Sequence, residues 1–146
     1  MLAKSRQYEF GRIFVCRLAH KSDLLEALTA FCTEQGLNAA FVSAIGAVTN
    51  ATVGFYDQEA KRYVTISLEE PLEIAHLAGN VSLKDGKPMV HAHVVLSRKN
   101  GETIAGHLMS PTPVFACEAF IAELGGEPLV REFDEPTGLT LWAALR

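Results

Sequence analysis

Cysteine is scarce in this chain, and long apolar runs are missing. The three cysteines among the 146 residues stand far apart and form no CxxC pair: Cys16, Cys32 and Cys117. An odd, scattered set is typical of reduced thiols rather than of a disulfide framework or a cysteine zinc site. No run approaches the roughly 18 apolar residues of a membrane span, and the first residues lack the apolar core and cleavage site of a signal peptide. We therefore expect a cytoplasmic location.

An excess of positive charge is also missing. Thirteen Lys and Arg against 17 Asp and Glu give a net charge of −4, the wrong sign for a protein that neutralises phosphates. Hydrophobic residues make up 49% of the chain and charged residues 21%, which indicates a packed core rather than disorder. No glycine-rich nucleotide-binding loop occurs. The length fits a single domain over residues 1–146.

One amphipathic helix follows a first strand. From Phe10 to Leu18, side chains alternate with the period of two of a strand. Ser22 or Asp23 then supplies an N-cap oxygen, and an apolar stripe of helical spacing runs through residues 24–32. Gly36 suits the left-handed position after a helix.

The remainder of the chain consists mostly of short segments rich in β-branched residues. Six of them are expected to be strands: Ala40–Val48, Ala51–Tyr56, Arg62–Leu68, Leu72–Leu83, Met89–Ser97 and Glu102–Met109. The polar turns at residues 57–60 and 85–88 predict antiparallel pairing. The fold class is therefore α+β, a mainly antiparallel β-sheet with one amphipathic helix packed on it.

Two C-terminal segments are less regular. Residues 114–124 suit either a helix or a buried strand, and periodicity alone leaves both open. Residues 128–142 read as two extended pieces bent at Pro136-Thr137-Gly138, with Leu139, Leu141 and Trp142 expected to return to the core.

Three histidines form the clearest chemical constellation. His91 and His93 flank Ala92 on one predicted strand, so both rings point to the same face. His107 lies on the next strand, and the loop between them decides whether it joins the pair. A two-residue turn at Asn100-Gly101, with Lys99 facing Glu102, would turn His107 to the other face.

A three-residue loop with Gly101 in a left-handed position would instead place His107 opposite His93. Hydrophobicity favours this second register. The three neutral imidazoles could then bind one divalent cation with an open fourth position, although three solvated histidines are the plain alternative. Gly106 beside His107 would allow another backbone or a ligand to approach closely.

Other reactive side chains are weaker candidates. His20 and His76 lack comparable partners and are interpreted as structural. Cys117 has no evident histidine partner. Glu118, a carboxylate within an apolar run, could orient a metal-bound histidine or act on bound water, but a structural role is favoured.

Several motifs along nearly the whole chain resemble one family. They are Ala44-Ile45-Gly46-Ala47-Val48, Leu72-Glu73-Ile74 leading to Ala78-Gly79, His91-Ala92-His93, Gly106-His107-Leu108, and Arg131-Glu132-Phe133-Asp134 followed by Thr137-Gly138-Leu139. In this order they resemble the plants-and-prokaryotes-conserved (PPC) domain, which in plants lies beside AT-hook motifs of nuclear DNA-binding proteins.

The resemblance implies a compact α+β homotrimer. It also implies that His91, His93 and His107 correspond to histidines that bind zinc in some prokaryotic members, and that residues 114–124 form a strand. The family's DNA-binding label would add DNA as a partner, but the AT-hook lies outside the domain, and this chain lacks its Arg-Gly-Arg-Pro core.

Three functions therefore compete at this point. The leading hypothesis is a homotrimer that binds zinc or another divalent metal through His91, His93 and His107, with water or a small anion completing the coordination. A metal-dependent hydrolase or lyase with Glu118 as proton relay is the enzyme alternative. The third is a transcription-associated protein that contacts DNA or a regulator.

Overall fold

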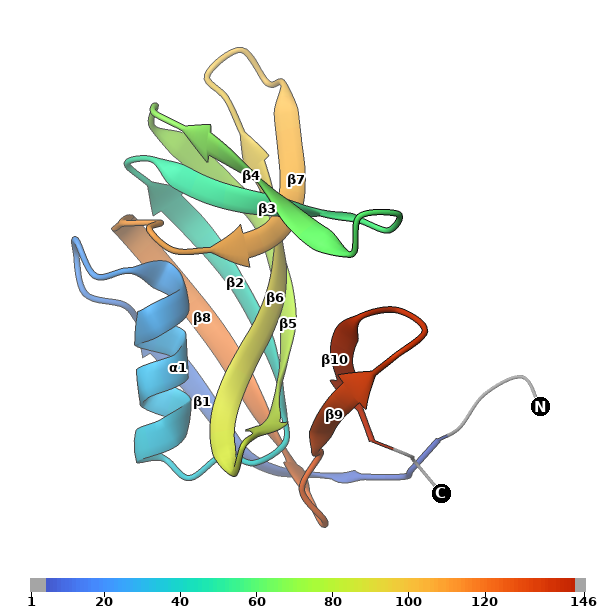
Figure 1. The fold of residues 1–146 in the computed structure, drawn as a ribbon. Coiled ribbons are helices and arrows are strands. Elements are labelled where there is room, and N and C mark those ends of the chain that lie inside the picture. Colours follow the sequence, from blue (N-terminus) through green and yellow to red (C-terminus); the bar gives the residue numbers. More distant parts are fainter. Residues whose placement is uncertain (1–4, 144–146) are drawn as a thin grey trace.

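One large antiparallel sheet with a single helix forms the molecule, seen in the computed structural model of Figure 1, which describes residues 5–143. The elements are β1 (Glu9–Arg17), α1 (Leu24–Glu34), β2 (Ala40–Val48), β3 (Ala51–Asp57), β4 (Arg62–Leu68), β5 (Leu72–Lys84), β6 (Lys87–Ser97), β7 (Thr103–Met109), β8 (Val114–Gly125), β9 (Arg131–Asp134) and β10 (Leu139–Trp142). The first eight strands pair in the order β1-β8-β2-β5-β6-β7-β3-β4, and β9 pairs with β10 in a separate small sheet. None of the described helices is long and apolar enough to cross a membrane.

Most of the local predictions are confirmed, including the antiparallel pairing of β3 with β4 and of β5 with β6. Asp23 is the N-cap of α1 and accepts a hydrogen bond from the Glu26 amide, whereas Ser22 lies outside the cap. Gly36 follows the helix with φ 66°, a conformation that favours glycine. The segment at residues 114–124, which periodicity could not decide, is β8, as the resemblance implied.

The tail differs from the prediction. The two extended pieces exist as β9 and β10, but Leu141 and Trp142 are 38% and 43% exposed. They lie on the small sheet, which stands apart from the helix (Figure 1). The apolar composition was therefore a wrong guide to burial at these two positions.

The core lies between α1 and one face of the large sheet. Leu24, Leu28 and Cys32 of the helix are fully buried, as are Val42 and Leu77 of the sheet. We call this the inner face of the sheet and the opposite one the outer face. Because successive residues alternate between faces, neighbours of these core residues point to the outer face.

Strand register aligns one row of side chains across the outer face. The row runs from β1 to β4 through directly paired residues: Val15, Phe120, Ser43, Ala78, His93, His107, Gly54 and Thr65. A second row contains Phe41, Asn80 and His91. The histidines thus share the outer face with exposed apolar side chains, and α1 does not cover them.

Candidate metal centre

The β6–β7 hairpin brings His93 and His107 directly opposite each other. Its loop has the three-residue form: the Arg98 amide donates to the Glu102 carbonyl at 2.8 Å, and Gly101 adopts φ 87°. The predicted register of the hairpin is therefore confirmed. A residue with a Cβ at Gly101 would be strained, because a positive φ disfavours L side chains.

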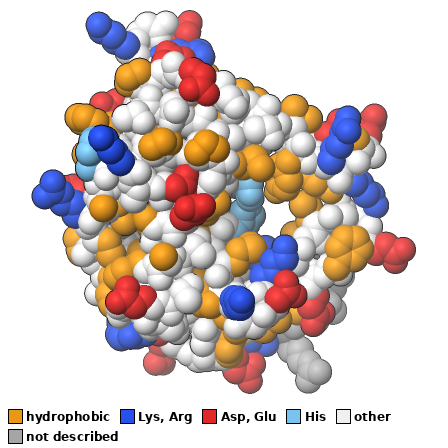
Figure 2. Space-filling model, turned by 60° about the vertical axis from the view of Figure 1, so that its left-hand side comes forward, with side chains coloured by type: hydrophobic (Ala, Val, Ile, Leu, Met, Phe, Trp, Pro, Cys, Tyr) orange, Lys and Arg blue, Asp and Glu red, His pale blue; other side chains and the backbone are white. Residues whose placement is uncertain are grey.

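His91, His93 and His107 form one compact cluster. Ring centroids are 5.3 Å apart for His91 and His93, 5.0 Å for His91 and His107, and 5.5 Å for His93 and His107. One nitrogen from each ring can be chosen so that all three lie within 4.8 Å of one another. His93 is exposed and the other two are half-buried. Figure 2 shows histidine side chains on the wall of a hollow in the molecular surface.

The surroundings of His91 and His107 favour the neutral imidazole. Burial, followed by His107, Arg131 and His93, lowers the pKa of His91 from 6.5 to about 4. Burial, followed by His93 and Arg131, also lowers the pKa of His107. A neutral imidazole keeps a free lone pair, which is what a metal ligand requires.

One nitrogen of the cluster is also unsatisfied. Nδ1 of His107 is buried and makes no hydrogen bond with the described residues. A buried polar atom without a partner costs free energy, and a bound cation is one way to satisfy it. Imidazole nitrogens suit zinc, copper, iron and nickel. The residues present therefore fit a divalent transition metal.

Neighbouring strands form the wall beside His107. The Tyr63 ring on β4 lies 4.7 Å from the His107 ring, measured between centroids. A Cβ at Gly106 would lie 2.9 Å from the Gly54 carbonyl oxygen on β3, so this glycine lets the β3 backbone approach. The close approach expected at Gly106 is thus found, and the approaching group is backbone.

A buried arginine stands on the other side of the cluster. Arg131 at the start of β9 is 8% exposed, and its Nη2 lies 3.3 Å from Nδ1 of His91. The guanidinium also donates to Ser82 Oγ at 2.6 Å and to Asn80 Oδ1 at 2.9 Å on β5, and to the Thr140 carbonyl at 2.9 Å on β10. The small sheet is therefore fastened to the large one next to the histidines.

Sequence reasoning assigned no role to Arg131, Asn80 or Tyr63. The available signal was the pair of polar residues Asn80 and Ser82 within a long, mostly apolar strand. Their spacing of two places both side chains on one face, where a buried partner was needed. Nothing in the sequence indicated that Arg131, about fifty residues further on, supplies that partner.

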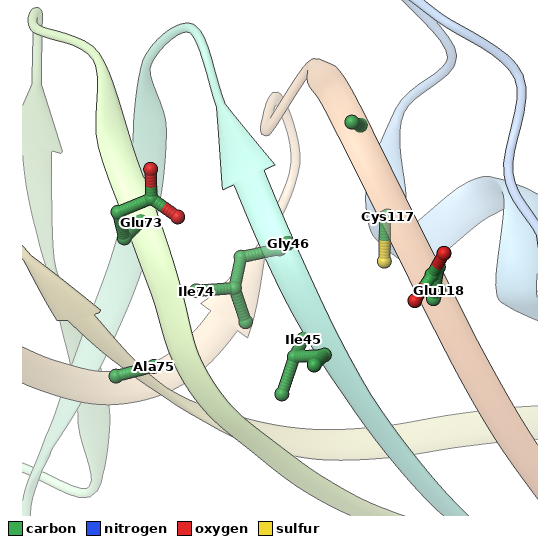
Figure 3. A pocket seen from close by; sticks show the side chains of 8 residues that line it. Ile45, Gly46, Glu73, Ile74, Ala75, Cys117 and Glu118 are labelled. Carbon is green, nitrogen blue, oxygen red and sulfur yellow. The ribbon is translucent and has the colours of Figure 1, made fainter.

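The other reactive candidates lie away from the cluster. Glu118 belongs to β8, which β2 and β5 separate from β6, a distance of roughly 14 Å at ~4.8 Å per strand. It lines a different pocket with Glu73, Ile45 and Cys117 (Figure 3). Burial first, then Glu118, raises the pKa of the Cys117 thiol to about 11. Glu118 therefore does not orient the histidines, and Cys117 stays a protonated thiol.

His20 and His76 remain outside the cluster, as predicted. Nδ1 of His20 lies 2.9 Å from the Phe115 carbonyl oxygen, and its ring packs edge-on against the Phe115 ring. His76 is exposed on β5. Neither histidine contributes to the group that could hold a metal.

Comparison with known proteins assigns the family. A model of the Plants and Prokaryotes Conserved (PCC) domain matches residues 5–125. The chain belongs to the Plants and Prokaryotes Conserved domain family. The resemblance to the PPC domain, based on motifs that include the histidine cluster, is thereby confirmed.

Solved structures share the fold over nearly the whole chain. A metal-containing protein from Archaeoglobus fulgidus is 50% identical with a TM-score of 0.92, over 97% of this chain and 99% of that one. A plant- and prokaryote-conserved (PPC) protein from Pyrococcus horikoshii is 37% identical with a TM-score of 0.91, over 97% and 98%. A Bacteroides thetaiotaomicron protein, provisionally named as DNA-binding, is 26% identical with a TM-score of 0.85, over 97% and 100%.

One relative carries a similar segment within a longer protein. The bifunctional protein GlmU of Synechococcus sp. (strain JA-3-3Ab) is 33% identical over 129 residues, which are 87% of this chain. The matched segment is 20% of that protein, so this chain spans about a fifth of its length.

Proposed function

We propose that this protein binds a divalent metal ion, zinc in the first instance, through His91, His93 and His107. The observation that carries the proposal is the convergence of three imidazoles, with one nitrogen of each within 4.8 Å of the others, and a buried Nδ1 that lacks a partner among the described residues. The metal-containing relative from Archaeoglobus fulgidus, half identical to this chain, adds support.

The three histidines leave part of the coordination to other groups. A zinc ion with three protein ligands has an open position, at which it would polarise water or a small anion. This chain's own contribution is to hold the imidazoles in register on two adjacent strands and to keep those of His91 and His107 neutral. The hollow on this side of the molecule gives a small ligand access (Figure 2).

Metal analysis tests the proposal. We expect purified protein dialysed against zinc to retain a single ion per chain by elemental analysis, and His93→Ala to lose it. His76→Ala is the matched control, because it removes an exposed histidine from a neighbouring strand and should leave the metal content unchanged. Equal metal content in wild type and His93→Ala would refute the site.

We also propose that the protein assembles as a homotrimer through the outer face. Large apolar side chains that are 46% to 81% exposed gather on strands β1, β8 and β2, as Val15, Phe10, Ile13, Ile45, Phe41 and Phe120. Contiguous exposed apolar surface of this kind is typical of protein interfaces. We call these six residues the apolar patch.

The other functions have less support. The provisional DNA-binding name of a relative stands against a net charge of −4, so DNA contact by this chain is not proposed. Glu118 cannot serve as the proton relay of a hydrolase or lyase at the histidines, because it lies on β8, which β2 and β5 separate from β6. A cytoplasmic location stays a prediction.

A further inference from the structure

We infer that Arg131 is an anion-binding residue, which holds the carboxylate or phosphate group of a small ligand beside the metal. The inference rests on the proposed metal site and names what approaches its open side. The first evidence is the set of hydrogen bonds that the guanidinium makes. Within residues 5–143, the acceptors around Arg131 are all uncharged: a hydroxyl, an amide oxygen, a backbone carbonyl and an imidazole nitrogen.

The charge of Arg131 is not neutralised by any described residue. The ion pairs of the described chain involve Arg6, Arg12 and Arg98, and none includes Arg131. Its side chain is nevertheless buried, with Trp142 6.0 Å from the guanidinium carbon, measured to the ring centroid. Burying a cation without a counter-charge costs free energy. An anion at this position would remove the cost.

The number of hydrogen bonds that Arg131 makes also favours a bound anion. A guanidinium has five N–H donors. Four have acceptors, on Ser82, Thr140, Asn80 and His91, and the fifth, on Nη1, has none among the described residues. Even in the metal-free protein, one N–H of Arg131 can therefore donate to a ligand.

Metal binding would free a second donor. Arginine can only donate, so Nδ1 of His91 is the acceptor in their 3.3 Å contact. A neutral imidazole has one lone pair, which cannot serve Arg131 and a metal ion together. A metal on Nδ1 takes that lone pair, whereas a metal on Nε2 leaves a proton on Nδ1. In both cases one Nη2 N–H of Arg131 loses its acceptor.

The charge of the loaded site calls for an anion. A divalent ion held by three neutral histidines keeps its full charge, and Arg131 adds another positive charge next to His91. Among the residues that the structure describes, no aspartate or glutamate belongs to the histidine group. Two free N–H groups on one guanidinium suit an oxyanion, because carboxylate and phosphate oxygens accept such bonds in pairs. The ligand class is therefore a small molecule with an oxyanion group.

Spectroscopy on cobalt-loaded protein tests this inference. Cobalt(II) reports changes in its surroundings through its visible absorption, and acetate and inorganic phosphate are titrated separately at constant ionic strength. We expect saturable spectral changes in wild type, and the tighter of the two anions identifies the group that is recognised. Arg131→Gln should weaken binding about tenfold or more. Arg17→Gln, an exposed arginine on the edge strand β1, should bind as wild type does.

A second variant separates anion binding from folding. Arg131 also fastens β9 to β5, so its replacement could loosen the small sheet. Asn80→Asp keeps the arginine and puts a carboxylate where Oδ1 now accepts its hydrogen bond at 2.9 Å. The inserted charge should compete with the ligand and abolish the anion response. The circular dichroism spectrum should stay that of the wild type.

The outcomes distinguish the metal site from the anion-binding role of Arg131. Equal anion affinity in wild type, Arg131→Gln and Asn80→Asp, with cobalt bound in all three, overturns the role of Arg131 and leaves the metal site standing. Cobalt that fails to bind to wild type overturns both proposals. A response to neither anion, with cobalt bound, refutes oxyanion recognition alone.

Discussion

At the scale of single residues, the histidines influence one another's protonation. Each ring lies within 5.5 Å of the other two, measured between centroids, and protonation of one disfavours protonation of its neighbours. In the metal-free protein the buried Nδ1 of His107 lacks a hydrogen-bond partner among the described residues, whereas a bound metal would satisfy it. This difference should be visible as stability.

Metal removal should destabilise the protein. At a free zinc concentration of about 100 times Kd, binding to the native state alone adds about 2.7 kcal/mol to the free energy of unfolding. Urea denaturation with zinc and with a chelator measures this difference. His76→Ala should show the same difference and His93→Ala should lose it. A chelator effect of equal size in His93→Ala would place the metal elsewhere.

A single glycine sets the distance between two central strands. Gly46 has φ 149°, and a Cβ there would lie 2.1 Å from the Ala116 carbonyl oxygen and 2.8 Å from the Cys117 Cα. Both obstacles are backbone, which cannot rotate away. Gly46→Ala should therefore lower the free energy of unfolding by about 2 kcal/mol or more.

Denaturant unfolding checks this expectation. Gly125→Ala is the control, because its nearest obstacle, the Glu9 carbonyl oxygen, lies at an ordinary contact distance of 3.5 Å. Its stability should stay close to that of the wild type. Two variants of equal stability would mean that β2 and β8 can separate at no cost.

At the scale of elements, local signals were sufficient for the hairpin but not for the sheet. The hairpin register, which pairs His93 with His107, was predicted correctly because histidine spacing, Gly101 and the strand apolar pattern all constrain one neighbouring pair of strands. The order of the eight strands and the nature of β8 depend on contacts between distant segments, such as β2 with β8. Such contacts leave no periodic trace in a short apolar run.

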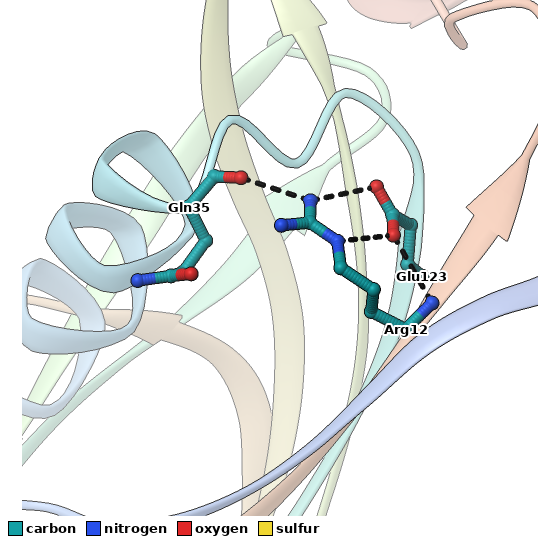
Figure 4. A network of polar contacts seen from close by, with 3 residues as sticks. All are labelled: Arg12, Gln35 and Glu123. Atoms are coloured by element: carbon teal, nitrogen blue, oxygen red, sulfur yellow. Dashed lines mark hydrogen bonds and ion pairs between the residues drawn. The ribbon is translucent and has the colours of Figure 1, made fainter.

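A polar network joins β1, β8 and the end of α1 (Figure 4). Arg12 donates from Nε to Glu123 Oε2 at 2.7 Å and from Nη2 to Oε1 at 2.9 Å, and Nη2 also donates to the Gln35 carbonyl at 2.9 Å. The hydrogen bonds from Arg12 lower the pKa of Glu123 below its ordinary value of 4.5. The carboxylate is thus more stable in the folded protein than in the unfolded one.

Glu123→Gln should destabilise the protein in a pH-dependent way. Since the folded pKa is the lower one, the contribution of Glu123 is complete above pH 4.5 and is lost as the pH falls through the folded pKa. Wild type should exceed Glu123→Gln in urea denaturation at neutral pH, and the difference should shrink in acid. Glu127→Gln, which removes an exposed partner of Arg6 at 3.2 Å, should differ little at any pH.

At the scale of the whole molecule, the outer face carries both the apolar patch of the proposed trimer and the histidines of the proposed metal site. Phe120 of the apolar patch and His93 of the cluster belong to the same row of paired residues, with Ser43 and Ala78 between them. A partner subunit on the patch would therefore approach the side from which the metal is reached. In the proposed trimer, other copies would cover these six large apolar side chains.

The last prediction is that one charge on the apolar patch abolishes the trimer. Val15 is 81% exposed and directly paired with Phe120, so Val15→Lys places an ammonium group within the patch without touching the core. Sedimentation should show wild type at three times 15.9 kDa and Val15→Lys at a single chain mass. Phe133→Lys is the control, because Phe133 is 72% exposed on β9, outside the patch, and this variant should remain trimeric.

Since His91, His93 and His107 all come from one chain, Val15→Lys should still bind zinc. A monomeric wild type would refute the trimer, whereas loss of zinc in the Val15→Lys monomer would show that the partner subunit completes the site.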